Sequence, residues 1–161
     1  MLIGLISDTH ITPKRGRLPD NVFEIFKDTD LIIHAGDITQ QSVIDELRGI
    51  SPVIAVLGNN DRLELNKTEI IEVFNFKIAV NHGTDCSGDF IKLKRLALQL
   101  KADILITGHT HTPHFEIIDD IMFVNPGSSN RPIKSNASVG LLEIKESDVS
   151  LGDIEVKFIE L

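Results

Sequence analysis

Five polar clusters recur along this chain, and each one follows a short apolar run. They contain seven side chains that can bind metal ions: Asp8, His10, Asp37, Asn59, His82, His109 and His111. The set mixes imidazole nitrogen with carboxylate and amide oxygen, which suits Mn, Fe, Ni or Zn better than an all-oxygen Mg or Ca site. The sequence therefore predicts two adjacent divalent transition-metal ions, and we favour Mn or Ni over Fe or Zn.

Two of the clusters place ligands at alternate positions. Asp8 and His10 are separated by one residue, so in an extended segment both side chains lie on the same side and can reach one ion. Any strand followed by a polar turn gives this pattern without a metal. His109 and His111 repeat the spacing in the sequence GHTH, which is the strongest single motif of the chain.

The other three clusters have simple alternatives when each is taken alone. Asp37 can bridge two cations ~3.5 to 4 Å apart, but it could also cap a helix that starts near residue 40. Asn59 in the sequence GNND could serve as a turn residue, and His82 as a polar residue at a strand end. We prefer the metal interpretation because all five clusters occur in one chain, each after an apolar run.

The elements expected around these clusters form an α/β sandwich, because short β-branched runs alternate with helical segments. Helices are predicted from Pro19, over 40–48 and over 90–101. Strands are predicted over 2–7, 31–35, 53–57, 70–73, 77–80, 104–107, 115–118, 121–125, 139–144 and 156–159. The five clusters then lie just past the carboxyl ends of strands, where open α/β sheets bind their ligands. We expect them to converge on one site.

Length and composition limit the possible functions. The 161 residues fit a single domain over 1–161, with a formal net charge of −8 that disfavours broad contact with nucleic acid or an anionic membrane. Aromatic residues make up 5% of the chain, which also argues against nucleic-acid binding. The single cysteine, Cys86, allows no internal disulfide, so a cytoplasmic location is expected. No apolar run reaches the ~18 residues of a membrane span.

The ordered motifs DxH, GD, GNxD, H and GHTH resemble the calcineurin-like metallophosphoesterase superfamily, and specifically its small single-domain branch of YfcE-type and archaeal phosphodiesterases. The match runs from residue 1 to about 129 and includes the segment NPGS at 125–128. The resemblance implies a four-layer α-β-β-α sandwich of two mixed sheets flanked by helices. It also implies a phosphoric diester hydrolase, in which a hydroxide bound to a dinuclear metal centre attacks a small phosphodiester substrate.

The same resemblance implies a division of the ligands between the two ions. Asp37 would bridge both ions. The first ion would also be held by Asp8, His10 and His111, and the second by Asn59, His82 and His109.

The chain departs from the wider superfamily at Asn60, where many members carry a histidine that is thought to protonate the leaving group. Asparagine cannot supply a proton at neutral pH, so we predict a preference for diesters with acidic leaving alcohols, such as aryl esters. Asn60, Asp61 and His109 are the candidate catalytic residues. Asp61 is expected to orient the loop or a ligand histidine rather than to bind metal.

Several residues and loops outside the five clusters could also contribute to substrate binding or to the core. Arg62 and Arg131 could clamp a phosphate or lie free on the surface, and His34 is expected to be a hydrogen-bonded core residue. A basic patch of Lys14, Arg15 and Arg17 could steer an anionic substrate. Substrate specificity is expected from the loops 11–18, 63–68 and 130–137.

The rivals are a protein-binding scaffold, like the eukaryotic retromer subunit Vps29, and a nuclease of the same superfamily. The complete ligand set favours the enzyme over the scaffold. Exposed β-rich edges make a homodimer plausible.

Overall fold

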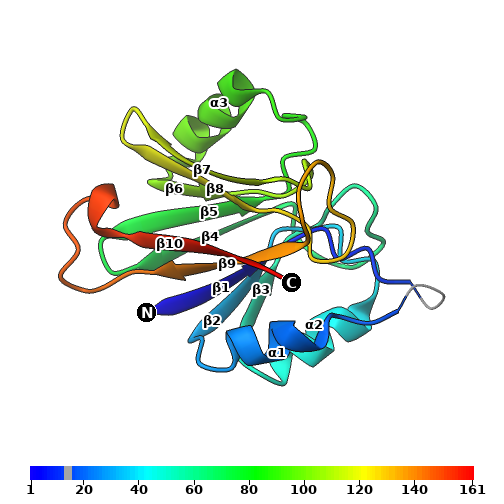
Figure 1. Cartoon of the computed structure of the whole chain (residues 1–161). Coiled ribbons are helices and arrows are strands. Elements are labelled where there is room, and N and C mark those ends of the chain that lie inside the picture. Colours follow the sequence, from blue (N-terminus) through cyan, green and yellow to red (C-terminus); the bar gives the residue numbers. More distant parts are fainter. Residues whose placement is uncertain (13–15) are drawn as a thin grey trace.

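The computed structural model describes residues 1–12 and 16–161, and it contains two five-stranded β-sheets packed face to face (Figure 1). The first sheet has the strand order β10-β9-β1-β2-β3, and the second has the order β4-β5-β6-β8-β7. The strands are β1 (Leu2–Ile6), β2 (Leu31–His34), β3 (Val53–Ala55), β4 (Thr68–Val73), β5 (Phe76–Asn81), β6 (Ile104–Ile106), β7 (Pro113–Ile118), β8 (Ile121–Pro126), β9 (Ser138–Glu143) and β10 (Glu155–Glu160).

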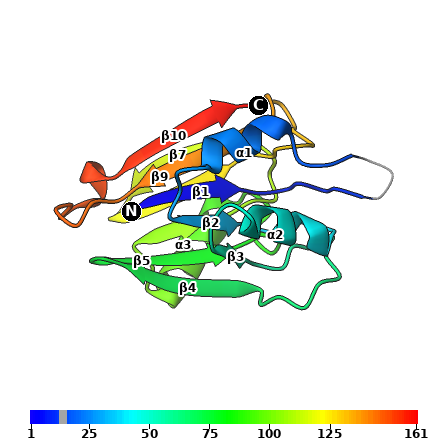
Figure 2. The same ribbon diagram turned by 90° about the horizontal axis from the view of Figure 1, so that it is seen from below.

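Both sheets are mixed. In the first sheet β1 runs parallel to β2, and β2 to β3, while β9 and β10 are antiparallel to their neighbours. In the second sheet β5, β6 and β8 are parallel, and the edge strands β4 and β7 are antiparallel. The helices α1 (Asp20–Phe26) and α2 (Gln41–Arg48) cover the first sheet, and α3 (Phe90–Leu100) covers the second (Figures 1 and 2). The predicted four-layer α-β-β-α sandwich is confirmed.

Three apolar clusters hold the layers together. One lies between the sheets and includes Ile3, Ile33 and Ile104, which have no exposed surface. A second lies beneath α1 and α2, where Phe26 packs so closely that a Cβ on Gly4 would come within 2.8 Å of its ring. The third joins α3 to its sheet. The central strands are apolar on both faces because both faces are covered, and this produced the continuous apolar runs seen in the sequence.

The observed ends of helix α3 lie close to the predicted ones, because a capping residue stands at each end. Asp89 caps its first turn by accepting hydrogen bonds from the backbone N–H groups of Ile91 and Lys92. Lys101 ends the helix in the left-handed conformation, with φ of 53°. The predicted hairpin around residue 75 is also confirmed, since β4 and β5 pair from Val73 opposite Phe76. A short 3₁₀ helix, η1 (Leu151–Asp153), precedes β10.

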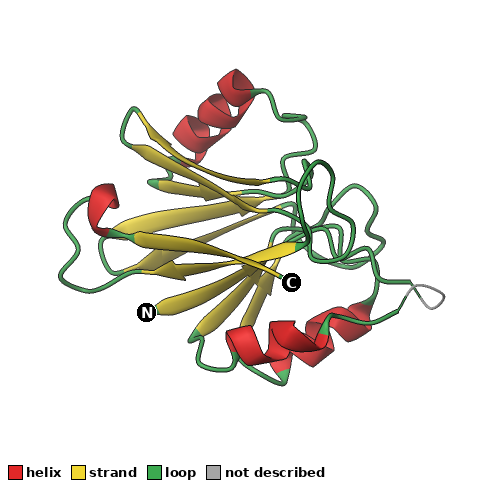
Figure 3. Ribbon diagram, viewed as in Figure 1, coloured by secondary structure: helices red, strands yellow, loops and turns green. Residues whose placement is uncertain are grey.

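The loops that follow β1, β2, β3, β5 and β6 gather at one end of the sandwich (Figure 3). This arrangement brings distant parts of the sequence to a common edge. Two residues of the predicted basic patch, Lys14 and Arg15, lie outside the described residues, and Arg17 pairs with Asp20. Within residues 1–12 and 16–161, no helix has the length and apolar character needed to cross a membrane.

Candidate metal centre

All seven candidate ligands lie in loops at the carboxyl ends of strands, as the sequence predicts. Asp8 and His10 follow β1, Asp37 follows β2, Asn59 follows β3, His82 follows β5, and both histidines of GHTH follow β6. One detail of the expectation is wrong: the segment with Asp8 and His10 is not extended. The two residues have φ of 52° and 45°, so the chain turns sharply between them.

Left-handed backbone recurs across the site. Asp37, His109 and His111 also have positive φ, of 57°, 69° and 57°. This region is uncommon for residues other than glycine and typically costs about 1 to 3 kcal/mol per residue, and such strain is concentrated at functional sites. Five of the seven candidate ligands therefore occupy a conformation that the surrounding structure has to enforce.

Two glycines allow the loops to approach closely enough. A Cβ at Gly58 would lie 2.2 Å from both the backbone nitrogen and Oδ1 of Asp37. A Cβ at Gly108 would lie 1.9 Å from the Ser7 hydroxyl oxygen. No side chain fits at either position, so glycine here is a requirement of the site's packing.

Four of the side chains form a compact cluster. One ligand atom from each of Asp8, His10, Asp37 and His111 lies within 4.8 Å of the others. Nε2 of His111 is 3.2 Å from Oδ1 of Asp8, and Nε2 of His10 is 3.4 Å from Oδ2 of Asp37. Two carboxylates and two imidazoles at this spacing are a donor set suited to a divalent transition metal.

The remaining candidates form a second group, which contacts Asp37 through His82. Nε2 of His82 is 3.4 Å from Oδ2 of Asp37, and Nδ1 of His109 is 3.1 Å from Oδ1 of Asn59. The rings of His82 and His109 meet edge to face, with centroids 5.2 Å apart. This group could hold a second ion that shares Asp37 with the first.

Two buried polar atoms in the centre have no hydrogen-bond partner: Oδ1 of Asp8 and Nε2 of His82. Their separation of 3.9 Å is too long for a hydrogen bond. A buried unpaired polar group costs about 1 to 3 kcal/mol, and more when it is charged. Divalent cations bound in the centre would give both atoms a partner, so the residues present fit a dinuclear metal site.

Two imidazoles of the centre are oriented through the ring nitrogen that faces away from the carboxylates. Nδ1 of His82 lies 2.7 Å from the carbonyl oxygen of Ala35, and Nδ1 of His111 bonds to the carbonyl of Arg131. Because a carbonyl only accepts, the Nδ1 atoms carry the protons in the neutral rings. The Nε2 lone pairs are then directed into the centre, as metal ligation needs.

The electrostatics of the centre favour cations. Burial opposes ionisation of Asp8, but the nearby imidazoles of His10 and His111 outweigh it and hold the pKa of Asp8 well below its usual range. The pKa of Asp37 is about 2, because the nearby imidazole of His82 and the hydrogen bonds from Asn60 overcome burial. Both carboxylates are therefore ionised at neutral pH.

The surroundings raise the pKa of two histidines of the centre and lower that of a third. The close contact with the Asp8 carboxylate raises the pKa of His111, and the pKa of His82 is raised because its contact with Asp37 outweighs burial. Burial and the neighbouring His82 lower the pKa of His109, which favours the neutral ring. A neutral His109 is ready to bind metal but is poorly suited to donating a proton.

Asp61, a candidate catalytic residue, lies behind the centre and holds two of its loops together. Its Oδ2 accepts hydrogen bonds from the backbone N–H groups of Asp37 at 3.0 Å and Gly58 at 2.8 Å, and its Oδ1 accepts one from Thr39 at 2.6 Å. It bonds to backbone and to no histidine. Of the two expected roles, the geometry supports orientation of the loop.

Asn60 makes a different contact from the one expected of a leaving-group acid. Its backbone N–H donates to Oδ1 of Asp37 at 2.8 Å, and its side-chain amide donates to Oδ2 at 2.6 Å. Both oxygens of the central carboxylate are therefore fixed by one residue. The alternative role of Asp37 as a helix cap is wrong, because Gln40 is the N-cap of α2 and no side chain caps that helix.

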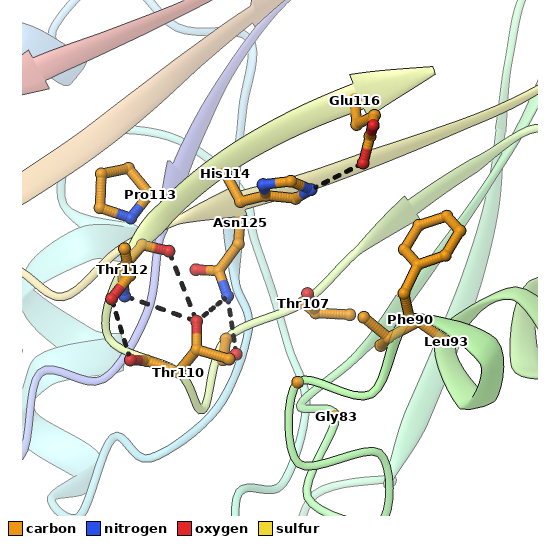
Figure 4. Close-up of a pocket in the computed structure, with 12 residues that line it drawn as sticks. Gly83, Phe90, Leu93, Thr107, Thr110, Thr112, Pro113, His114, Glu116 and Asn125 are labelled. Atoms are coloured by element: carbon orange, nitrogen blue, oxygen red, sulfur yellow. Dashed lines mark hydrogen bonds and ion pairs between the residues drawn. The ribbon is translucent and has the colours of Figure 1, made fainter. Parts of the chain in front are cut away.

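Further anchoring residues could not be identified from the sequence motifs. The side-chain amide of Asn125 donates to the carbonyl of Gly108 and to the hydroxyl of Thr110, which holds the GHTH loop from behind (Figure 4). The hydroxyl of Ser128 donates to the carbonyl of Asp8 at 2.7 Å. Both residues belong to the NPGS segment, and they give that motif a structural role next to the centre.

His34 is a core residue, as expected. It has no exposed surface, and its Nδ1 accepts a hydrogen bond from the backbone N–H of Gly36 at 3.2 Å. Nε2 then carries the proton and donates to the Thr9 hydroxyl, 3.2 Å away. Burial lowers the pKa of His34 to about 3, because a charged ring there would be cut off from water.

Residues outside the centre show ordinary surface or core environments. The side chains of Arg62 and Arg131 form no ion pair among the described residues, and both residues are exposed. Cys86 is buried, and burial raises the pKa of its thiol, so it has no thiolate character.

The comparisons with known proteins agree with this geometry. Residues 1–147 match the sequence model of the calcineurin-like phosphoesterase superfamily domain. A probable metallophosphoesterase of Methanocaldococcus jannaschii, MJ0623, is 43% identical over 148 residues, which cover 91% of this chain and 77% of that protein. Phosphodiesterase MJ0936 of the same organism is 30% identical over 171 residues, covering 92% of this chain and 96% of that protein.

Among solved structures, wild-type Vps29 of Entamoeba histolytica in complex with zinc is 29% identical and superposes with a TM-score of 0.83. The alignment covers 99% of each chain.

Proposed function

Since this chain belongs to the calcineurin-like phosphoesterase superfamily, we propose that it is a metal-dependent phosphodiesterase that hydrolyses a small phosphodiester. The observation that carries the proposal is the pair of buried, unpartnered ligand atoms, Oδ1 of Asp8 and Nε2 of His82. Buried polar atoms are paired in most proteins, and an unpaired pair beside two ionised carboxylates is explained by cations.

We assign the first ion to Asp8, His10, Asp37 and His111, and the second to Asp37, Asn59, His82 and His109. The mutual spacing of the first four side chains supports this division. Mn or Ni is the preferred metal, with Fe or Zn next, and the zinc complex of the Entamoeba Vps29 supports metal binding by this fold. When bound, two such ions lower the pKa of water toward neutrality and offset the charge of the phosphoryl oxygens.

The protein's own residues position these groups. Asp61 ties the loop of Asp37 to the loop of Asn59, and Asn60 fixes the Asp37 carboxylate from one side. Asn60 has no proton to give a leaving alkoxide, which favours diesters of acidic alcohols over alkyl monoesters. The relative MJ0936, named a phosphodiesterase, supports the same substrate class.

A protein-binding scaffold is the second candidate function, and the likeness to Vps29 favours it. The two candidates differ in what they need from the centre. A hydrolase requires loaded metals for turnover, whereas a scaffold needs only the folded surface.

We further propose that the chain forms one domain over 1–161 and acts in the cytoplasm. We also propose that it does not bind nucleic acid, because its net charge of −8 opposes contact with a polyanion. A homodimer would use an exposed sheet edge. β4 and β7 are both edge strands, and they carry the exposed apolar side chains Ile70, Phe115 and Ile117.

The decisive experiment uses metal-stripped protein reloaded separately with Mn, Ni, Zn or Mg. Each form is assayed with bis(p-nitrophenyl) phosphate and with p-nitrophenyl phosphate. We expect turnover of the diester with Mn or Ni, and loss of it in Asp37→Ala with an unchanged circular dichroism spectrum. The matched control, Asp28→Ala, removes an exposed carboxylate on the surface and should leave turnover unchanged. An active, metal-free Asp37→Ala protein contradicts the proposal, and silence with every metal favours the scaffold.

A further inference from the structure

A polar cavity of about 260 Å³ opens beside the candidate metal centre. Its wall includes two candidate ligands, Asn59 and His82, together with Lys67, Asn81 and Thr84. Two larger cavities, of about 340 and 450 Å³, include none of the seven candidate ligands. A phosphoester group held at the centre on the side of Asn59 and His82 therefore has this cavity next to it.

Lys67 provides the positive charge in the cavity wall; the other charged side chains there, Asp61 and Asp85, are acidic. Lys67 is exposed, and none of the ion pairs formed by the described residues includes it. An ammonium without a carboxylate partner is available to an anionic ligand. In a chain with a net charge of −8, a free cation next to a phosphate-binding centre is a specific feature of that surface.

The backbone of Lys67 is tied to the centre by Asn81. The side-chain amide of Asn81 donates to the carbonyl of Lys67 at 3.1 Å and to the hydroxyl of Thr68 at 2.8 Å. Its Oδ1 accepts from the backbone N–H of Gly83 at 2.8 Å. One side chain thus links the backbone of Lys67 to the loop that carries His82.

The loop before Lys67 is fixed on its other side as well. The backbone N–H of Leu57 donates to the carbonyl of Asn66 at 2.8 Å, which ties residue 66 to the segment leading into Asn59. The backbone at residues 66 and 67 is therefore held from two sides, by Leu57 and by Asn81. A loop whose backbone is already ordered loses less conformational entropy when a ligand binds.

We infer that Lys67 is a catalytic residue whose ammonium stabilises the leaving group of the phosphodiester in this cavity; the inference rests on the proposed function. Water adds its oxygen to phosphorus and releases one proton to solvent, and the bond from phosphorus to the leaving ester oxygen breaks. The electron pair of that bond stays on the leaving oxygen, which then takes a proton from solvent. The charge that develops on this oxygen is opposed by the ammonium, which compensates for the missing acid at Asn60.

The test is a leaving-group series: methyl phosphodiesters of p-nitrophenol, p-chlorophenol and phenol, assayed with the metal-loaded protein. Lys67→Met removes the charge and keeps the length of the side chain, and Lys67→Arg keeps the charge. Lys157→Met, on β10, makes the same charge change on another exposed surface.

We expect Lys67→Met to lower kcat/KM about 3-fold for p-nitrophenol and about 30-fold for phenol, because the poorer leaving group develops more charge. Lys67→Arg and Lys157→Met should stay within about 2-fold of the wild type for every ester, since neither removes the charge from the cavity. Equal losses across the series, or the same losses in Lys157→Met, overturn the inference.

A second readout does not depend on turnover. Calorimetric titration of the metal-loaded proteins with inorganic phosphate should show binding about 5-fold weaker in Lys67→Met than in the wild type, at equal metal content. Absence of turnover by the loaded wild type overturns the proposed function. In that case equal phosphate affinities of the two proteins overturn the assignment of Lys67 as well, and weaker binding by the variant supports it as an anion-binding residue.

Discussion

Protonation of His34 should destabilise the metal-free protein in mild acid. The pKa of His34 is about 3 in the folded protein, compared with 6.5 for an unperturbed histidine. The unfolded chain therefore binds a proton that the folded protein excludes. A depressed pKa of this kind gives stability that is complete above about pH 6.5 and is lost as the pH falls toward 3.

The size of the effect follows from the shift. Each pKa unit corresponds to about 1.4 kcal/mol, so the full loss is about 4 to 5 kcal/mol and the part between pH 6 and pH 4 is about 2 to 3 kcal/mol. This is a large fraction of the 5 to 15 kcal/mol by which typical domains are stable. The main structural cause is burial, since the ring of His34 has no exposed surface; an added proton on Nδ1 would also face the N–H of Gly36, which now donates to that atom.

Few other groups interfere in this window. The pKa values of His82 and His111 are raised, so the stability that they contribute develops as the pH falls through the unfolded value of 6.5 and changes little between pH 6 and pH 4. The pKa values of Asp8 and Asp37 are lowered, so protonation of these carboxylates reduces the free energy of unfolding mainly below about pH 4. His109 has a lowered pKa and adds in the same direction as His34. It is best removed in the background by His109→Asn.

The assay is urea unfolding in EDTA at pH 6, 5 and 4, on the His109→Asn protein with and without His34→Asn. The asparagine carbonyl can accept the hydrogen bond from Gly36 and cannot be protonated in this range. We expect the free energy of unfolding to fall by about 2 to 3 kcal/mol more between pH 6 and pH 4 when His34 is present. The comparison is between the slopes of the free energy of unfolding against pH, so a loss of stability in His34→Asn that is the same at every pH does not affect the result. Equal slopes would refute the reasoning.

Three further predictions concern the metal centre. Gly58→Ala would place a methyl group 2.2 Å from the backbone and carboxylate of the bridging candidate, so metal content by mass spectrometry should fall below half, whereas Gly152→Ala, with 3.7 Å of clearance, should keep it. Asp61→Asn should weaken metal binding about 10- to 100-fold in calorimetry, because two loops lose their shared carboxylate; unchanged affinity would contradict this. Because the pKa values of His82 and His111 are raised, metal binding at pH 6.5 should release protons, and affinity should rise with pH. Calorimetric titrations in buffers of different ionisation enthalpy measure this release, and a binding enthalpy that is the same in every buffer would contradict the prediction.

The order of elements and the positions of the candidate ligands at strand ends could be predicted from the sequence, because both depend on local patterns. Buried strands read as apolar runs, and polar clusters after them mark the edge where ligands bind. The helix predicted over 90–101 is Phe90–Leu100 in the structure, with Lys101 as its cap. His34 could be assigned to the core because it stands inside an apolar run.

The contacts that give Asn60 and Asp61 their roles could not be predicted, because they depend on turns that the residue types do not specify. Asp8 and His10 were expected in an extended segment, yet both are left-handed, as is Asp37. The turn at Asp37 directs its backbone N–H at Asp61 and its carboxylate at Asn60. The role of Asn125 is also hidden, since its partners in the GHTH loop are 15 and 17 residues away.

The placement of the ligands in the fold has a consequence for how the protein is made. Asp8 accepts a hydrogen bond from the backbone of His109, 101 residues later, and β1 pairs with the late strand β9. During translation the ribosome releases Asp8, His10 and Asp37 long before the GHTH loop exists, and non-local pairing of this kind forms late. A nascent chain can offer only part of the ligand set. Under the proposed ligand assignment, the metal is therefore selected only after the GHTH loop at 108–111 has been synthesised.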